Sequence, residues 1–129
     1  MIEEIPRKEW VPFLDAFSRA HEGWLVSVDV FGPDRTEATE ADEQPLIGLT
    51  ADHGGNRPAV SVVVGREPDG VLTHIIEGAE RVRLNRTTDG TESAVEIQDG
   101  EGRVTTVRLR TAIAPEMVDG VAGDRGATG

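Results

Sequence analysis

The sequence predicts an α+β fold in which one N-terminal helix packs on a strongly bent antiparallel sheet of six or seven strands. Three observations support this class. Apolar residues recur at helical spacing near the N-terminus, strand-like alternation dominates from residue 24 onward, and the last third holds two turns that suit β-hairpins. We expect the sheet either to stay open or to close in part into a small barrel.

The helix is predicted from an apolar stripe close to the start of the chain. Four residues share one helical face: Trp10, Phe13, Leu14 and Phe17. Pro12 lies within this stripe and lacks the N–H that a helix interior needs. We therefore expect a loose turn over residues 7–11 and a regular helix over 12–21, with proline at its first position.

Strand patterns follow the helix. In residues 24–31 apolar and polar side chains alternate, which is typical of a half-buried strand. Residues 33–43 hold five acidic residues and one arginine, and we expect a solvated connection there. Further strands are predicted over 45–51, 58–64 and 71–77, separated by turns rich in glycine, proline and aspartate.

The first hairpin of the last third is predicted around Asp89-Gly90, a dipeptide that suits a two-residue loop. This loop puts the apolar residues of both strands on one face. A slip of one residue would put them on opposite faces, so the register is well specified. The predicted pairs are Leu84 with Val95, and Val82 with Ile97.

The second hairpin is predicted to have a three-residue loop, Gly100-Glu101-Gly102. A loop of two or four residues would put the apolar side chains of its strands on opposite faces. Gly102 supplies the left-handed residue that such loops need at their third position. The predicted pairs are Val95 with Val107, and Ile97 with Thr105, which makes residues 79–110 a three-stranded antiparallel meander.

The length, net charge and cysteine content of the chain limit its possible domain organisation and its possible partners. A chain of 129 residues is most simply one domain, which we assign to residues 1–111, with a flexible tail over 112–129. The net charge of −11 would repel nucleic acid and anionic lipid, so neither is an expected partner. Cysteine is absent, which excludes disulfides and thiolate metal sites. The polar N-terminus and the lack of a long apolar run predict a cytoplasmic protein.

Ser18, His21 and Glu22 are the first residues to test for catalysis. A zinc-protease helix would need a second histidine at position 25, which is Leu25. A serine nucleophile would need an orienting acid and oxyanion donors, for which the sequence shows no motif. We interpret Gly23 as the left-handed residue that ends the helix. On this interpretation Gly23→Val should destabilise the fold, and His21→Ala should cost little.

The three histidines, His21, His53 and His74, show no recognised metal-ligand spacing, so neither a metal nor another cofactor is predicted. His74 lies in an apolar strand, where a core or edge position is the commoner role. The alternative is a small hydrolase that uses His21 or His74 with a nearby carboxylate. A concave pocket with His74 in hydrogen-bond reach of a carboxylate would favour that enzyme.

The candidate binding site is an arginine face on the outer side of the meander. Four arginines alternate there with apolar residues: Arg81, Arg83, Arg108 and Arg110. Residues 79–110 hold six basic and six acidic side chains, so the negative net charge lies elsewhere. One interpretation is a solvated face with cross-strand ion pairs, such as Arg83 with Glu96. The other is a site for an acidic protein partner or for the acidic loop of a second copy.

Resemblance to a known family rests on several stretches, among them EIPRKEWVPFLDAFSRAHEGWLVSVDV, THIIEGAERVRL and EIQDGEGRVTTVRLR. In these the chain resembles a family of short bacterial proteins catalogued only as a domain of unknown function. The resemblance runs from residue 5 to residue 120 and implies a bacterial single-domain protein without an assigned activity. One helix followed by about five strands also resembles the order of Sm-like barrels, of which only the topology is carried over.

The function predicted from these observations is that of a small, acidic, non-enzymatic binding or interaction module. Its partner would be an unknown protein or a second copy of the chain.

Overall fold

The computed structural model describes residues 1–34, 37–53, 57–66 and 68–111. Within these ranges the chain forms one α-helix, one short 3-10 helix and eight strands. In chain order they are β1 (Ile2–Ile5), η1 (Arg7–Glu9), α1 (Trp10–Ala20), β2 (Leu25–Phe31), β3 (Glu37–Asp52), β4 (Ala59–Arg66), β5 (Gly70–Glu77), β6 (Ala79–Arg86), β7 (Glu92–Asp99) and β8 (Val104–Thr111). The tail predicted over 112–129 lies outside the described residues. No helix in these ranges is long and apolar enough to cross a membrane.

The strands form one sheet with the order β1-β6-β7-β8-β2-β3-β4-β5, and all pairings are antiparallel. β1 and β5 are its two edges, so the sheet is open. One N-terminal helix on a large antiparallel sheet is therefore confirmed. The predicted six or seven strands and the partial barrel are wrong, because the sheet has eight strands and does not close. The Sm-like topology is not confirmed.

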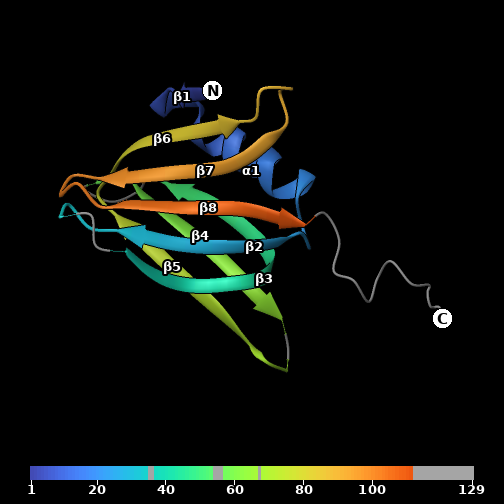
Figure 1. Ribbon diagram of the computed structural model, residues 1–129. Coiled ribbons are helices and arrows are strands. Elements are labelled where there is room, and N and C mark those ends of the chain that lie inside the picture. Colours follow the sequence, from blue (N-terminus) through green and yellow to red (C-terminus); the bar gives the residue numbers. More distant parts are fainter. Residues whose placement is uncertain (35–36, 54–56, 67, 112–129) are drawn as a thin grey trace.

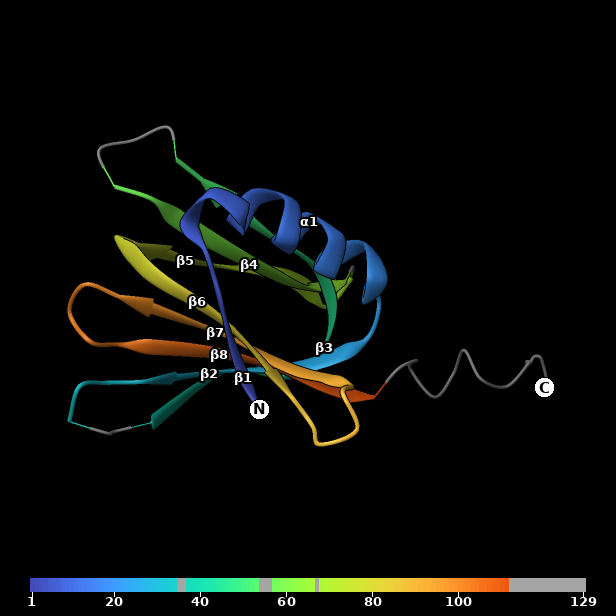
Figure 2. The ribbon, with the colours of Figure 1, turned by 90° about the horizontal axis from the view of Figure 1, so that it is seen from above.

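β3 bends the sheet because its two halves have different neighbours. Residues 37–45 pair with β2, whereas residues 46–52 pair with β4. The sheet therefore folds into two layers, visible in Figures 1 and 2. The first layer holds β1, β6, β7, β8, β2 and the first half of β3, and the second layer holds the second half of β3, β4 and β5.

Two strand segments contradict the sequence prediction, and both are acidic. β1 was not predicted, and residues 37–43 were expected to be a solvated loop. Most side chains of the first half of β3 are exposed, while Ala41 faces the core with an exposed fraction of 8%. The acidic composition thus indicated solvated side chains correctly. It did not reveal that the backbone pairs with β2, because strand pairing uses main-chain groups.

α1 begins two residues before the predicted start and ends at Ala20. Pro12 is its third residue, and the N–H groups of the first helical turn have no partner inside the helix. Proline there removes no hydrogen bond, which explains why the helix can begin at Trp10. The main contact of α1 with the sheet is with β3.

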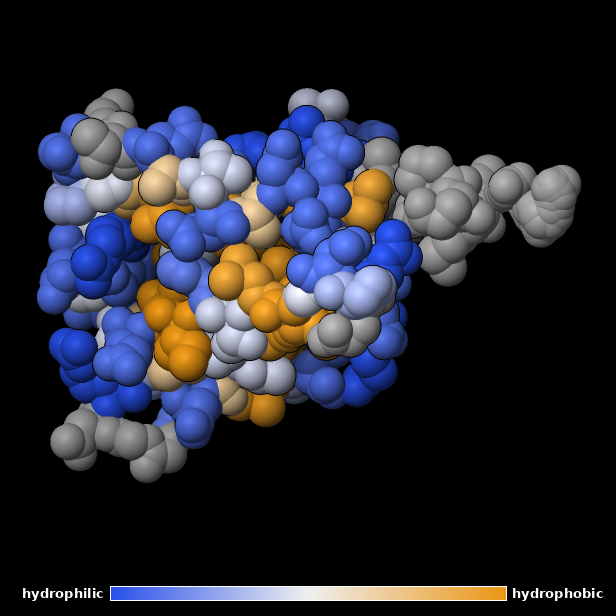
Figure 3. Space-filling view, turned by 90° about the horizontal axis from the view of Figure 1, so that it is seen from below, coloured by the Kyte–Doolittle hydropathy of each residue, from blue (hydrophilic) through white to orange (hydrophobic). Residues whose placement is uncertain are grey.

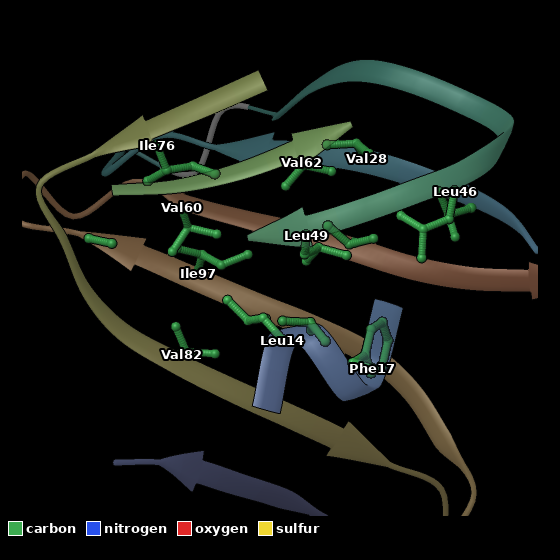
Figure 4. Close-up of a cluster of buried hydrophobic side chains, with 14 of the residues drawn as sticks. Leu14, Phe17, Val28, Leu46, Leu49, Val60, Val62, Ile76, Val82 and Ile97 are labelled. Carbon is green, nitrogen blue, oxygen red and sulfur yellow. The ribbon is translucent and has the colours of Figure 1, made fainter. Parts of the chain in front are cut away.

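The hydrophobic core lies between the two layers and α1. Figure 4 shows side chains from α1 and from strands of both layers converging on it. From α1 it receives Trp10, Leu14 and Phe17, and Phe13 packs against it while partly exposed. The largest fully buried sheet residues are Leu46, Leu49, Leu84, Ile97, Val26, Val28, Val60, Val62, Val64 and Val82.

The register of both predicted hairpins is confirmed, but the predicted loop length of the first hairpin is wrong. The Thr87 N–H donates to the Thr91 carbonyl at 2.9 Å, so the loop has three residues and not two. A bulge at Ser93 takes up the extra residue, and the Ser93 hydroxyl donates to the Asn85 carbonyl at 2.9 Å. The predicted pairs Leu84 with Val95, Val82 with Ile97, Val95 with Val107 and Ile97 with Thr105 all occur.

Gly78 alone joins β5 to β6, and these two strands lie in different layers. Its φ of +69° is left-handed, a conformation that favours glycine. The Gly78 carbonyl accepts a hydrogen bond from the Gly100 N–H at 3.1 Å, which links this corner to the β7–β8 turn. A Cβ at position 78 would lie 2.8 Å from the guanidinium carbon of Arg57, so that side chain packs over Gly78.

Candidate functional site

Ser18 has structural partners on β3. Its hydroxyl accepts from the Leu49 N–H at 2.7 Å and lies 3.0 Å from the Leu49 carbonyl and 2.7 Å from the Leu14 carbonyl. Leu49 belongs to the half of β3 that has β4 on one side and, among the strands that the structure describes, none on the other. The hydroxyl thus satisfies backbone groups that a neighbouring strand would otherwise satisfy. This arrangement gives Ser18 a role in fixing α1 to β3.

His21 is buried at the junction of α1 and the sheet, with an exposed fraction of 6%. Its Nδ1 lies 2.9 Å from the Phe17 carbonyl and therefore donates to it, and its Nε2 lies 3.5 Å from a Glu92 carboxylate oxygen. The ring packs between Phe17 and Trp24, with centroid distances of 4.3 and 4.7 Å. The backbone N–H of His21 donates to the Ser18 carbonyl at 3.3 Å, but their side chains make no hydrogen bond to each other, so the two residues do not form a catalytic pair.

His21→Ala is expected to lower the free energy of unfolding by about 1–3 kcal/mol, the usual range for loss of a buried, packed side chain. This reverses the mild effect expected from sequence alone. Gly23→Val should cost about 1–2 kcal/mol, because Gly23 has a φ of +85° but no atom lies within 4 Å of an added Cβ. Urea denaturation of both variants would measure how much unfolding free energy each one loses. Glu22→Ala is the control, because Glu22 is exposed. A His21→Ala variant as stable as the parent would contradict this prediction.

The structure divides the predicted arginine face. Arg83 is held by three side chains of the first layer: its Nε lies 3.5 Å from Glu4, its Nη1 lies 3.5 Å from Glu96, and its Nη2 donates to Gln98 at 2.8 Å. Arg81 reaches the same Glu4 at 3.9 Å. Arg83 and Glu96 are directly opposite each other, as the predicted register requires. These two arginines therefore neutralise acidic neighbours.

Arg108 and Arg110 on β8 differ from the first two, because neither makes an ion pair within the described residues. Arg110 is exposed. Arg108 is half-buried and lines a groove of about 660 Å³ on the outer side of β7 and β8, whose rim includes Phe31 and Pro33. The arginine face thus has two separate parts. Arg81 and Arg83 form ion pairs, whereas Arg108 and Arg110 form none within the described residues.

A second groove runs along β5, which we call the β5 groove. One part, of about 440 Å³, lies between β5 and the β7–β8 turn, and another, of about 630 Å³, lies between β5 and the first half of β3. The residues of β5 that line it are Gly70, Val71, Leu72, His74, Ile75, Ile76 and Glu77. Seen from below, hydrophobic side chains gather in the middle of this side of the molecule among hydrophilic ones (Figure 3).

β5 is also an unprotected sheet edge. It pairs with β4 over eight residues without a register shift, and no strand of the described residues lies on its other side. Val71, Leu72 and Ile75 are 47%, 39% and 55% exposed. Edge strands are usually short, charged, bulged or interrupted by proline, which prevents further strand pairing. β1, the opposite edge, follows that rule with four residues, two of them glutamates, whereas β5 does not.

Asp99 organises the polar end of the β5 groove, where its side chain is almost fully buried. It accepts hydrogen bonds from the N–H groups of Glu101 and Arg103 at 2.9 and 3.0 Å, and from the Arg103 Nε at 2.9 Å. Burial by itself raises the pKa of Asp99, but the hydrogen bonds from the Arg103 side chain, the Arg103 backbone and the Glu101 backbone outweigh it and lower the pKa below its usual value. The carboxylate is therefore charged at neutral pH and fixes the turn.

His74 and Arg57 line the same end of the groove without fixed partners. Within the described ranges the His74 side chain makes no hydrogen bond or ion pair, and Arg57 makes no ion pair. His74 thus meets the first condition for an enzyme, a concave pocket, but not the second, a carboxylate in hydrogen-bond reach. No group of three histidine, aspartate or glutamate side chains in the described part of the chain could hold a metal ion.

The geometry defines a small α+β protein with one helix, an open antiparallel sheet and a groove along an unprotected edge. The model of a family of unknown function, DUF5335, matches residues 1–118. The chain belongs to this family, which confirms the resemblance to a domain of unknown function. No curated protein and no solved structure gives a significant match. Because the family carries no assigned activity, the site itself must support any functional proposal.

Proposed function

We propose that the protein is a non-enzymatic binding module that holds an extended polypeptide segment along β5. The observation that carries this proposal is the free edge of β5, whose residues 71–75 include no aspartate, glutamate, lysine or arginine and whose exposed apolar side chains lie beside the β5 groove. An added strand would pair with the outward N–H and C=O groups of β5. It would also cover Val71, Leu72 and Ile75, whose exposure otherwise costs free energy in water.

The class of partner follows from charge and chemistry. An extended protein segment supplies backbone groups that can pair with the free edge of β5 and apolar side chains that can cover its exposed apolar residues. Nucleic acid and anionic lipid supply neither, and the net charge of −11 repels both. On the arginine face, Arg108 and Arg110 are the cations left for an acidic part of such a partner.

A hydrolase is the alternative, and one observation favours it: His74 lines a concave pocket together with Glu77 and Asp99. The Asp99 carboxylate already accepts three hydrogen bonds, from the Glu101 N–H, the Arg103 N–H and the Arg103 Nε, and His21 is buried against Glu92. Binding is therefore better supported than catalysis. A hydrolytic activity abolished by His74→Ala would favour the enzyme instead.

Peptide selection on the full chain, followed by fluorescence anisotropy with the selected peptides, tests the binding function. Ile75→Lys is expected to weaken binding at least tenfold, because it places a charge in the middle of the β5 edge. Ile47→Lys is the matched control, since Ile47 is similarly exposed at 45% but does not line the β5 groove. Its binding should equal that of the parent.

Two results would count against this proposal. Equal binding by the parent and Ile75→Lys would show that β5 is not the contact surface. Loss of binding only in the double variant Arg83→Glu, Arg108→Glu would move the site to the arginine face.

A further inference from the structure

We propose that the segment held along β5 is β5 of a second copy, so that two molecules pair edge to edge about a two-fold axis. This inference rests on the proposed function and specifies its partner. In a symmetric antiparallel pair, each residue lies opposite a residue at the same distance on the other side of the axis. The sequence of β5 can therefore be tested for its fit to itself.

The outer face of β5 fits a two-fold axis through Thr73. Ile76, which precedes the corner at Gly78, is buried, so residues 72, 74 and 76 face the core and residues 71, 73 and 75 face outward. An axis through Thr73 places Val71 of each copy opposite Ile75 of the other, and Thr73 opposite itself. Cross-strand pairs of β-branched residues stabilise sheets.

Neighbouring axes fit poorly. An axis through residue 72 would place Ile75 opposite Asp69, and an axis through residue 74 would place Val71 opposite Glu77. Each would bury an apolar side chain against a carboxylate. An axis between two residues would set outward side chains opposite inward ones. Among these axes, only the one through Thr73 covers both exposed outer residues with apolar partners.

Charged side chains lie at both ends of β5 in this arrangement. The end at Gly70 is acidic, since Glu40, Asp42 and Asp69 line the groove there. The other end holds Arg57, which makes no ion pair within the described residues, together with Glu77 and with Asp99 and Glu101, which both pair with Arg103. Antiparallel pairing brings the Gly70 end of one copy to the Glu77 end of the other. The axis through Thr73 also places Asp69 of one copy opposite Glu77 of the other, and Arg57, which lines the groove together with Glu77, is the cation available to these two carboxylates. Residues 71 to 75 include no aspartate, glutamate, lysine or arginine.

The assembly stops at two copies because β5 is the one unprotected edge among the strands that the structure describes. β1, the other edge, carries Glu3 and Glu4, and Glu4 is engaged by Arg81 and Arg83. An interface that uses the same patch on both molecules closes on itself, whereas a contact between different edges would build a filament. The geometry therefore points to a dimer.

The chain has no cysteine, so single cysteine substitutions test the axis directly. Thr73→Cys is expected to form a disulfide-linked dimer under mild oxidation, because directly opposite Cβ atoms lie about 4.5–5.5 Å apart, close to the disulfide range. Val71→Cys and Ile75→Cys should not cross-link alone but should cross-link when mixed. Cross-linking of Leu72→Cys or His74→Cys in preference to Thr73→Cys would overturn the axis.

Analytical ultracentrifugation of the full chain provides the independent readout. The parent and Ile47→Lys should be dimers, and Ile75→Lys should be a monomer with an unchanged circular dichroism spectrum. A monomeric parent that still binds selected peptides through β5 would overturn the dimer and leave the binding function standing. A dimer that persists in Ile75→Lys would overturn the proposed interface.

Discussion

Trp10→Ala is expected to lower the free energy of unfolding by about 3–5 kcal/mol, the largest effect of any single change considered. Trp10 is the first residue of α1, is 1% exposed and packs in the core. Its indole Nε1–H donates to the Ile5 carbonyl at 2.9 Å. Because Ile5 ends β1, the indole ties the edge strand to the helix, and truncation removes both this hydrogen bond and a large buried surface.

Urea denaturation followed by circular dichroism measures this effect. A small domain has a total stability of about 5–15 kcal/mol, so Trp10→Ala can leave a largely unfolded chain. Trp10→Phe keeps most of the packing but loses the donor, and it should fall between the parent and the alanine variant. Val11→Ala is the adjacent control, since Val11 is 49% exposed. A Trp10→Ala variant within 1 kcal/mol of Val11→Ala would refute the assigned role.

Asp99→Asn is expected to lower the free energy of unfolding by about 1.5–3 kcal/mol at neutral pH, because it removes charge-assisted hydrogen bonds in a nearly buried turn. The effect should depend on pH. The pKa of Asp99 is lower in the folded than in the unfolded chain, so its stabilising contribution is complete above the unfolded value of about 3.9. It is lost as the pH falls through the lowered pKa of the folded state.

Denaturant titrations of the parent and Asp99→Asn between pH 7 and pH 3 would test this dependence. The free energies of unfolding of the two proteins should differ clearly at neutral pH and approach each other in acid. Glu101→Gln is the matched control: Glu101 pairs with the same arginine at 2.9 Å, but its side chain is 71% exposed. An exposed ion pair contributes little, so this variant should stay close to the parent. A gap between the parent and Asp99→Asn that is constant with pH would argue against the charged role of Asp99.

The hairpin registers could be predicted because they depend on local parity. Apolar residues alternate strictly on both strands, and a shift of one residue would expose one set of them. The loop around Gly90 could not be predicted to the residue, because a bulge at Ser93 compensates for a longer turn without changing the pattern. The same pattern of side chains is thus compatible with two backbone paths.

The edges of the sheet and the setting of His21 depend on contacts between distant parts of the chain. No local sequence pattern predicts that β5 has one neighbouring strand in the sheet whereas β7 has two. Likewise, His21 lies beside a helix end in the sequence, but its burial comes from Trp24 and from Glu92 at the start of β7. The candidate groove was missed for this reason. The uncharged run at residues 71–75 was its only signal, and a central strand would show the same run.

The corner at Gly78 has a consequence for the kinetics of folding. The β4–β5 hairpin precedes it and the β6–β7–β8 meander follows it, and both are built from contacts between sequence neighbours. By contrast, the β1–β6 and β2–β8 pairings join segments that are far apart in the sequence. Pairings of high sequence separation form slowly, because the loop they close must be ordered first. The two local units should therefore form early, and the docking of β2 on β8 should limit the folding rate.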